Sequence, residues 1–305
     1  MNKVLKRLLL AASLCCLITS VNAAPIDDAI AAHGRGDYAQ ALKILRPLAK
    51  GHASAQYNLG NMYYDGQGVT QDYKEAVKWY RLAAAQGHAS AQYFLGSMYH
   101  IGQGVIQDHK EGNKWYRLAA ARGDVSAQYF LGFRYDVGDG VTQDYKEALK
   151  WYRLSAEQGH AEAQFTVGFK YETGEAVTQD YKEALKWYRL AAEQGHAEAQ
   201  TRLGVLYEKG QGVPQNYQEA VKWFRLSAAQ GNPEAQTFLG LMYSGGKGVP
   251  RDNVRAHMWA NIVAAGDGGK GVEYRDSLTK RMTPQQIEKA QEMARKCQER
   301  NFKGC

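Results

Sequence analysis

Residues 72–87 read DYKEAVKWYRLAAAQG, and closely similar sequence returns every 36 residues along the chain. The period is clearest in six tryptophans, Trp79, Trp115, Trp151, Trp187, Trp223 and Trp259. A fixed period of this length predicts a solenoid, in which each repeat buries its apolar face against its neighbours. The six copies follow one another without insertions, at residues 53–88, 89–124, 125–160, 161–196, 197–232 and 233–268.

Each copy predicts two helices joined by a glycine-containing turn. In the first copy, apolar residues at helical spacing mark a helix over residues 53–64, and Gly66 follows where a left-handed C-terminus is expected. Asp72 and Glu75 open the second helix with the spacing of a capping box, in which each side chain binds a backbone amide of the first turn. These carboxylate pairs recur with the period, which favours helix caps over a proton-transfer array. The tryptophans are expected to be the main apolar anchors.

Two copies depart from the common pattern. Gly112 and Asn113 replace the Ala-Val or Ala-Leu of copies one, three, four and five, and glycine inside a helix costs about 1 kcal/mol relative to alanine. We therefore expect local opening or a bend in the second copy. In the fourth copy, Ala176 stands where the others have glycine.

The ends of the array differ from its middle, as repeat proteins require. Residues 24–52 read as a degenerate N-terminal capping repeat. After residue 269 the period stops, and residues 269–305 predict two closing helices, over 272–281 and 284–301. Thr283 followed by Pro284 is typical of an N-cap and a first helical turn.

The first 23 residues have the order of a secretory signal peptide. Lys3, Lys6 and Arg7 precede an apolar run of 11 residues, and Ala23 supplies a small residue for cleavage. The run is shorter than the roughly 20 residues that a membrane-spanning helix needs, so no transmembrane anchor is expected. Leu14 precedes Cys15, which disfavours a lipoprotein signal. We expect a periplasmic location, or secretion to the cell surface.

Export would leave two cysteines, Cys297 and Cys305. In an oxidising compartment this pair can close a small loop, and the alternative is two free thiols. The formal net charge of +7 divides into +3 over residues 1–23, +4 over 269–305 and zero between them. This distribution does not indicate nucleic-acid binding. No cofactor or metal ligand set is predicted.

These residues identify the chain as similar to the Sel-1-like repeats, which are related to the tetratricopeptide repeat. The resemblance rests on Leu59-Gly60-x-x-Tyr63, Gly66-x-Gly68-Val69, Asp72-x-x-x-Ala76, Trp79 and Ala83-Ala84-x-x-Gly87, and on their counterparts in each copy. It implies an all-α, right-handed superhelical solenoid of antiparallel helix pairs. Exported bacterial members resemble scaffolds and adaptors in envelope assembly, cell division and host contact. We therefore expect a monomeric, non-enzymatic scaffold that binds a protein or peptide partner, such as peptidoglycan-associated machinery.

By the same resemblance, the second, fifth, ninth and twelfth positions of each first helix face the hollow of the superhelix. Aromatic side chains have a large contact area and few rotamers to restrict, which suits an extended peptide. The alternative is that these rings pack against neighbouring helices. The predicted partner-binding residues are Tyr57, Tyr93, Tyr129, Phe133, Asp136, Phe165, Phe169, Glu172 and Glu208.

An enzymatic alternative rests on Ser277 and Lys280, which satisfy the Ser-x-x-Lys pattern of penicillin-recognising enzymes. A β-lactam- or peptidoglycan-interacting enzyme would use this C-terminal region. The companion motifs Ser-Asp-Asn and Lys-Thr-Gly are absent from the sequence, so we predict no catalytic residues.

Overall fold

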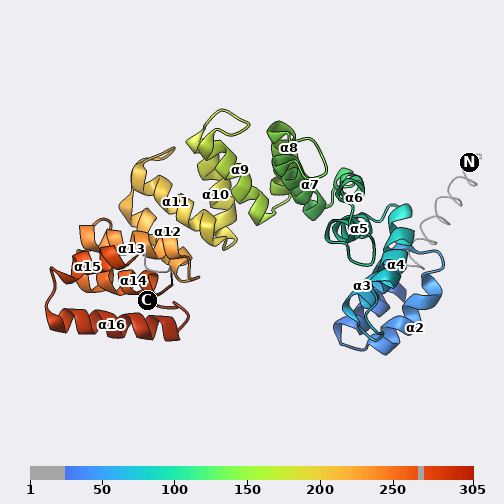
Figure 1. The fold of residues 1–305 in the computed structure, drawn as a ribbon, viewed down its shortest axis with the longest axis horizontal. Coiled ribbons are helices and arrows are strands. Elements are labelled where there is room, and N and C mark those ends of the chain that lie inside the picture. Colours follow the sequence, from blue (N-terminus) through green and yellow to red (C-terminus); the bar gives the residue numbers. More distant parts are fainter. Residues whose placement is uncertain (1–24, 267–270) are drawn as a thin grey trace, which may run out of the picture. The chain divides into compact units, whose positions relative to one another are not determined.

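The computed structural model describes residues 25–266 and 271–305, and its regular elements there are all helices (Figure 1). Residues 25–34 are helical. The predicted signal peptide lies outside the described residues. The other helices are α2 (Tyr38–Leu48), α3 (Ala53–Asp65), α4 (Tyr73–Ala85), α5 (Ala89–Ile101), α6 (His109–Ala121), α7 (Val125–Val137), α8 (Tyr145–Glu157), α9 (Ala161–Thr173), α10 (Tyr181–Glu193), α11 (Ala197–Lys209), α12 (Tyr217–Ala228), α13 (Pro233–Gly245), α14 (Asn253–Gly266), α15 (Val272–Thr279) and α16 (Pro284–Glu299).

The chain forms two compact units, one up to Asp144 and one from Tyr145 onward. In the first unit, each helix from α2 to α7 packs against the next one along the chain. In the second unit the same holds from α8 to α14, and α15 and α16 both pack on α14. Consecutive packing of paired helices confirms the predicted all-α solenoid.

Local sequence explains where the helices begin and end. Gly66 ends α3 with a φ of 71°, a left-handed conformation that glycine adopts without steric cost. Asp72 begins α4 by accepting hydrogen bonds from the amides of Lys74 and Glu75. The reciprocal half of the predicted capping box is wrong, because Glu75 pairs with Lys78 at 2.6 Å instead. The Asp72 amide donates to the carbonyl oxygen of Tyr63, which ties the turn to the preceding helix.

Close packing within a helix pair joins a glycine of the first helix to the residue after the tryptophan. Tyr80 is fully buried, and a Cβ placed on Gly60 would lie 2.6 Å from its ring. The same arrangement recurs in later copies, at Gly96/Tyr116, Gly168/Tyr188 and Gly204/Phe224. Trp79 is only partly buried beside it. The residue that follows the tryptophan therefore fills the space between the helices of a pair.

The two departures from the repeat pattern, Gly112-Asn113 in the second copy and Ala176 in the fourth, differ in their backbone conformation. Helix α6 runs without interruption through Gly112 and Asn113, and both residues are buried. Ala176 adopts a φ of 67°, the left-handed conformation that glycine takes at this position in the other copies. Alanine therefore bears a local backbone strain there.

The C-terminal segment closes the second unit. Thr283 caps α16 in a complete capping box with Gln286, and Pro284 lies in the first turn, which confirms the predicted start of this helix. Cys297 near its end is joined to Cys305 by a disulfide, with the two Cα atoms 5.7 Å apart. Within 25–266 and 271–305, no helix has the length and apolar character needed to cross a bilayer.

Candidate partner-binding surface

The fifth-position rings of the first helices are mostly engaged in packing against other aromatic side chains of the solenoid. Tyr57 stacks on His88, the N-cap residue of α5, with ring centroids 4.6 Å apart. Phe165 stacks in the same way on His196, at 4.8 Å. Tyr93 stacks on Tyr116 at 5.7 Å and is half-buried, and this burial raises the pKa of its hydroxyl. These three rings therefore have a structural role whether or not they also touch a partner.

The ninth-position rings are the exposed ones. Phe133 of α7 is 40% exposed and Phe169 of α9 is 36% exposed, each in its own unit. The guanidinium of Arg134 lies 5.4 Å from the centroid of the Phe133 ring, and the Phe165 ring lies 6.5 Å from that of Phe169. Exposed rings held by neighbouring side chains offer contact area with little ordering cost, which suits binding.

The remaining predicted residues are partly buried and take part in local contacts. Tyr129 packs edge-on against Phe130, with centroids 5.5 Å apart. Glu172 accepts a hydrogen bond from the hydroxyl of Tyr188 at 2.5 Å; burial, together with this carboxylate, raises the pKa of that hydroxyl.

Main-chain contacts also involve two of these acidic residues. The backbone carbonyl of Asp136 accepts a hydrogen bond from the side-chain amide of Gln143 at 2.8 Å. The carbonyl of Glu208 accepts one from Gln215 at the same distance. Lys247 lies 3.9 Å from the Glu208 carboxylate. The acidic positions thus help to hold the solenoid together.

Sequence reasoning missed an exposed apolar row on the second helices. A leucine at the same position of five copies is 39–50% exposed although it follows the buried core residues closely: Leu82, Leu118, Leu154, Leu190 and Leu226. The sequence contains a signal for this row, because it is unusual for five copies to keep an apolar residue at a position outside the core. The row supplies a second apolar surface within each unit.

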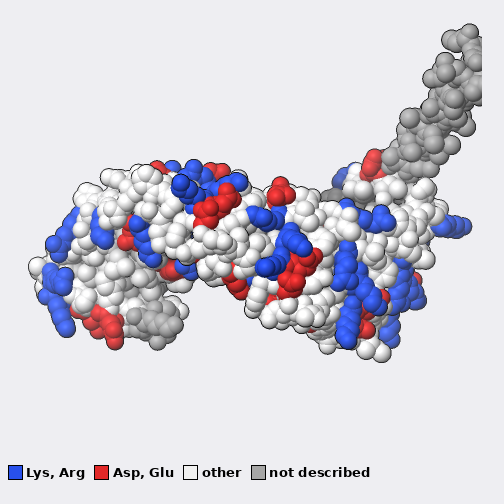
Figure 2. Space-filling model, turned by 90° about the horizontal axis from the view of Figure 1, so that it is seen from above, with Lys and Arg blue, Asp and Glu red and all other residues white. Residues whose placement is uncertain are grey.

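Charged groups do not form a single-sign surface on the face shown in Figure 2, where acidic and basic side chains lie beside one another. Many of them pair within one helix turn, as Lys114 does with Glu111 at 2.7 Å. A mixed surface of this kind is not typical of nucleic-acid binding.

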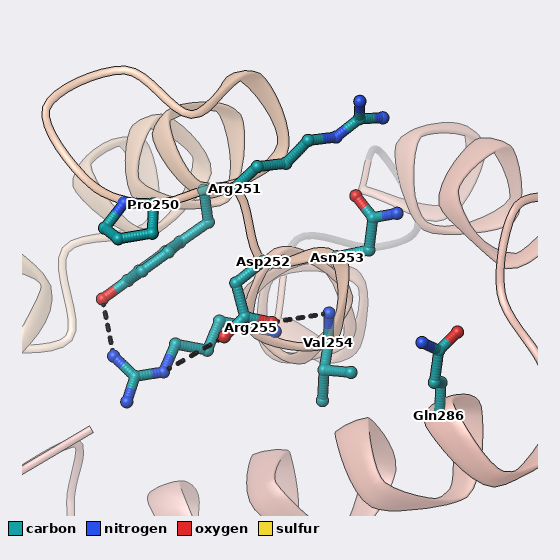
Figure 3. Close-up of a pocket in the computed structure, with 8 residues that line it drawn as sticks. Pro250, Arg251, Asp252, Asn253, Val254, Arg255 and Gln286 are labelled. Carbon is teal, nitrogen blue, oxygen red and sulfur yellow. Dashed lines mark hydrogen bonds and ion pairs between the residues drawn. The ribbon is translucent and has the colours of Figure 1, made fainter.

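A cavity of about 580 Å³ lies in the second unit at the start of α14 (Figure 3). Three of its polar residues are engaged in local hydrogen bonds: Asp252 accepts the amides of Val254 and Arg255, and Arg255 donates to the hydroxyl of Tyr243 at 3.0 Å. Of the eight lining residues none is a serine, cysteine or histidine. The cavity therefore offers no nucleophile paired with a base.

The Ser-x-x-Lys pair lies elsewhere, on α15. Ser277 is exposed, and its hydroxyl donates to the carbonyl oxygen of Tyr274 at 2.7 Å. Lys280 is also exposed, just past the end of this helix. A nucleophilic serine needs its proton directed at a base, and this one is directed at the backbone. The geometry gives the enzymatic alternative no support.

The solenoid matches known proteins. A family model described as the Sel1 repeat matches residues 53–88, 89–124, 125–160, 161–196, 197–232 and 233–266. A Sel1 repeat protein from Oxalobacter formigenes is 35% identical over 79% of this chain and 100% of its own, with a TM-score of 0.69. The protein c5321, a protective antigen present in uropathogenic Escherichia coli strains and displaying an SLR fold, is 28% identical. That match covers 94% of this chain and 78% of the antigen, with a TM-score of 0.57.

No match was found among curated proteins. The family model, by contrast, matches six successive segments that together span well over half of the sequence. The chain therefore belongs to the Sel1 repeat family.

Proposed function

We propose that this protein is a non-enzymatic scaffold of the bacterial cell envelope that binds a protein or peptide partner through its first helices. Sel1 repeat proteins are generally protein-interaction scaffolds. The sequence of residues 1–23 supports export to the periplasm or cell surface. The similar antigen of uropathogenic Escherichia coli makes host contact one role to test, beside envelope assembly and cell division.

The exposure of Phe133 and Phe169 is the observation that carries this proposal. Both rings stand at the ninth position of a first helix, and Leu241 of α13 occupies the same position with similar exposure. Large apolar side chains in the interior of a regular helix normally face the core. Their exposure is therefore better explained by a partner that covers them than by the stability of the solenoid.

The test compares two surfaces that are equally exposed. Mature protein would be used to capture partners from an envelope extract, beside a Phe133→Ser/Phe169→Ser variant and a control Leu118→Ser/Leu190→Ser variant on second helices. We expect a protein that binds the parent and the control and is lost from the phenylalanine variant, while circular dichroism shows that all three are folded. Equal capture by all three would contradict the proposal, and loss only from the leucine variant would move the binding site to the second helices.

A further inference from the structure

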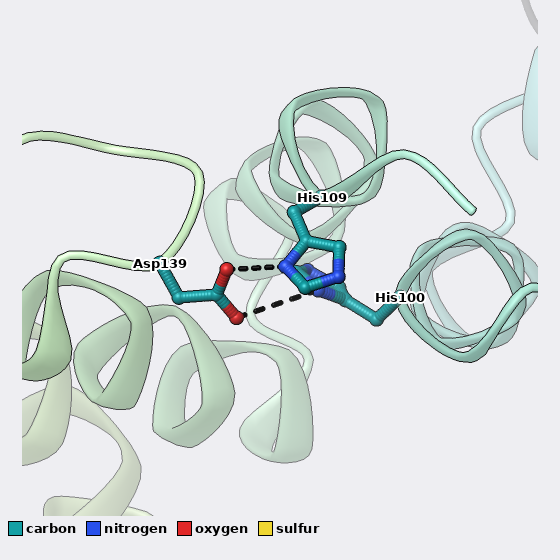
Figure 4. Close-up of side chains that lie close together, drawn as sticks. All are labelled: His100, His109 and Asp139. Atoms are coloured by element: carbon teal, nitrogen blue, oxygen red, sulfur yellow. Dashed lines mark hydrogen bonds and ion pairs between the residues drawn. The ribbon is translucent and has the colours of Figure 1, made fainter.

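A group of polar substitutions converges in the first unit, between the second and third repeats (Figure 4). His100 in the last turn of α5 occupies the position of Tyr64, Asp136, Glu172, Glu208 and Ser244 in the other copies. His109 replaces a tyrosine that four of the other five copies have, and Asp139 lies in the loop after α7. One ligand atom from each of His100, His109 and Asp139 lies within 4.8 Å of the other two.

Hydrogen bonds fix the protonation of His100. Its Nε2 lies 2.9 Å from Oδ1 of Asn113, and Nδ2 of Asn113 donates to the backbone carbonyl of Asp139 at 2.7 Å. The second bond sets the orientation of the amide, so Oδ1 must accept and Nε2 of His100 must carry the proton. Nδ1 is left with a free lone pair, since histidine at neutral pH has only one ring proton.

That lone pair is buried and faces the other two side chains. His100 is only 6% exposed, and its Nδ1 has no hydrogen-bond partner. Nδ1 lies 4.0 Å from Oδ2 of Asp139, too far for a hydrogen bond. Nδ1 of His100 therefore faces the Asp139 carboxylate with no hydrogen bond between them, and the three side chains enclose a space that fits a cation.

We propose that His100, His109 and Asp139 form a binding site for a divalent transition-metal ion such as Zn²⁺. Two imidazole nitrogens and one carboxylate oxygen suit zinc and its neighbours, whereas Ca²⁺ and Mg²⁺ require oxygen ligands. Asn113 acts as the outer partner that metal-binding histidines commonly have, because it holds the ring and its tautomer. Three protein ligands leave one tetrahedral position for water or for a donor group of a bound protein.

The ligands need only a small movement to close on a metal. Zinc–ligand distances of about 2.0–2.2 Å place neighbouring ligand atoms of a tetrahedral site roughly 3.3–3.6 Å apart. The His109 side chain is 39% exposed at the start of α6, and its Nδ1 already contacts Oδ1 of Asp139. Rotation of this exposed ring supplies the adjustment, while His100 stays in place.

Arg134 sets the affinity of the site. Its guanidinium pairs with Oδ2 of Asp139, so it competes with a metal through its charge and leaves Oδ1 as the oxygen for the ion. Copies one, two and six have methionine at this position, which shows that the fold accepts an uncharged side chain: Met62, Met98 and Met242. Replacing Arg134 by methionine removes the competing cation and should strengthen metal binding.

The test uses untagged, metal-free protein, with Co²⁺ followed by its absorption spectrum and Zn²⁺ by calorimetry. We expect one ion per chain, a loss of affinity of at least about tenfold in His109→Gln and Asp139→Asn, and tighter binding in Arg134→Met. His196→Asn is the matched control, because His196 lies 2.9 Å from Glu162 and 3.5 Å from Glu198. Asparagine already caps the corresponding helix of the sixth copy as Asn232, so this control should fold.

The outcomes separate cleanly. If the parent binds no ion, if His109→Gln binds as tightly as the parent, or if His196→Asn loses the ion, the proposal is wrong. Should Asp139→Asn fail to fold by circular dichroism, His109→Gln decides alone, because its side chain is partly exposed and lies in the first turn of α6. The result does not depend on the identity of a protein partner.

Discussion

The imidazole of His100 fills the space that Gly112 leaves open: a Cβ at residue 112 would lie 2.7 Å from Cδ2 of that ring. The other copies have alanine at the position of Gly112 and no histidine at that of His100. Glycine is therefore a packing requirement of the second copy and not a defect in its helix. Asn113 is the third change, because its side chain binds the buried ring at a position where four of the other five copies have valine or leucine.

We expect Gly112→Ala to destabilise the protein, although alanine favours a helix by about 1 kcal/mol over glycine. The added methyl group must displace His100 or the nearby carbonyl of Gly96, and overpacking of this kind costs about 1–3 kcal/mol. Urea unfolding together with amide hydrogen exchange of α5 and α6 measures the effect.

The matched variant combines Gly112→Ala with His100→Glu, which restores the Ala–Glu combination of the fourth copy, Ala184 with Glu172. If packing against the histidine is the cause, the double variant recovers stability relative to Gly112→Ala. Equal instability of the two variants would contradict this explanation.

The 36-residue period was enough to predict the fold, because each copy repeats the same helix, turn and cap signals. It also indicated which positions vary between copies. The role of Tyr57 or Phe165 could not be predicted in this way. Their rings stack on the histidines that cap the next first helix, and such pairs depend on the spacing of helices in three dimensions.

The hydrogen bonds between successive repeats could not be predicted from the sequence either. The guanidinium of Arg81 donates to the hydroxyl of Tyr99 at 2.7 Å and so links α4 to α5. The same pair recurs in the fifth copy, where Arg225 donates to Tyr243 at 2.9 Å. Separate analysis of the two residues shows only an exposed arginine and an aromatic ring. The geometry shows a link between successive repeats.

Ala176→Gly should stabilise the protein, although replacing alanine by glycine usually destabilises a folded protein. The left-handed φ of 67° costs an alanine about 1–2 kcal/mol. Glycine removes this strain but adds about 0.4–1 kcal/mol of unfolded-state entropy, so we expect a net gain of about 0.5–1 kcal/mol. The urea midpoint of the second unit measures it.

Gly212→Ala is the opposite experiment at the same position of the next copy. Gly212 has a φ of 72°, and a Cβ there would lie 2.5 Å from the carbonyl oxygen of Tyr181. This variant should be destabilised. A gain in stability on Gly212→Ala would show that backbone strain at this turn does not govern stability.

The C-terminal repeat should lose stability in mild acid because of His257. This ring is buried, its Nε2 lies 2.9 Å from the Thr279 hydroxyl, and burial, with a smaller effect of Arg275, lowers its pKa. The unfolded chain has a histidine pKa of about 6.5, so it binds more protons than the folded chain below that pH. The stabilisation is therefore complete above pH 6.5 and is lost as the pH falls toward the lower folded pKa.

Urea unfolding at pH 7.5 and pH 5.0 tests this for the parent and for His257→Gln, whose amide can still donate to Thr279. Burial also lowers the pKa of His88 and His160, so the parent contains more than one acid-sensitive group. The informative quantity is therefore the loss of unfolding free energy between pH 7.5 and pH 5.0, compared between the parent and His257→Gln. His257→Gln should lose less stability on acidification, and an unchanged loss would exclude His257 as a contributor.

Reduction of the disulfide between Cys297 and Cys305 should loosen the last helix without unfolding the repeats. The bond closes a loop between residues eight apart, and restriction of so short a loop is worth about 2–3 kcal/mol. Because each element of a solenoid contacts only its neighbours, we expect the loss to stay local to α16. Hydrogen exchange after reduction should therefore accelerate in residues 284–305 and remain unchanged in α9 and α10. A Cys297→Ser/Cys305→Ser variant should show the faster exchange without reductant and no further response to it, and unchanged exchange of α16 in the reduced parent would show that the bond does not hold this helix.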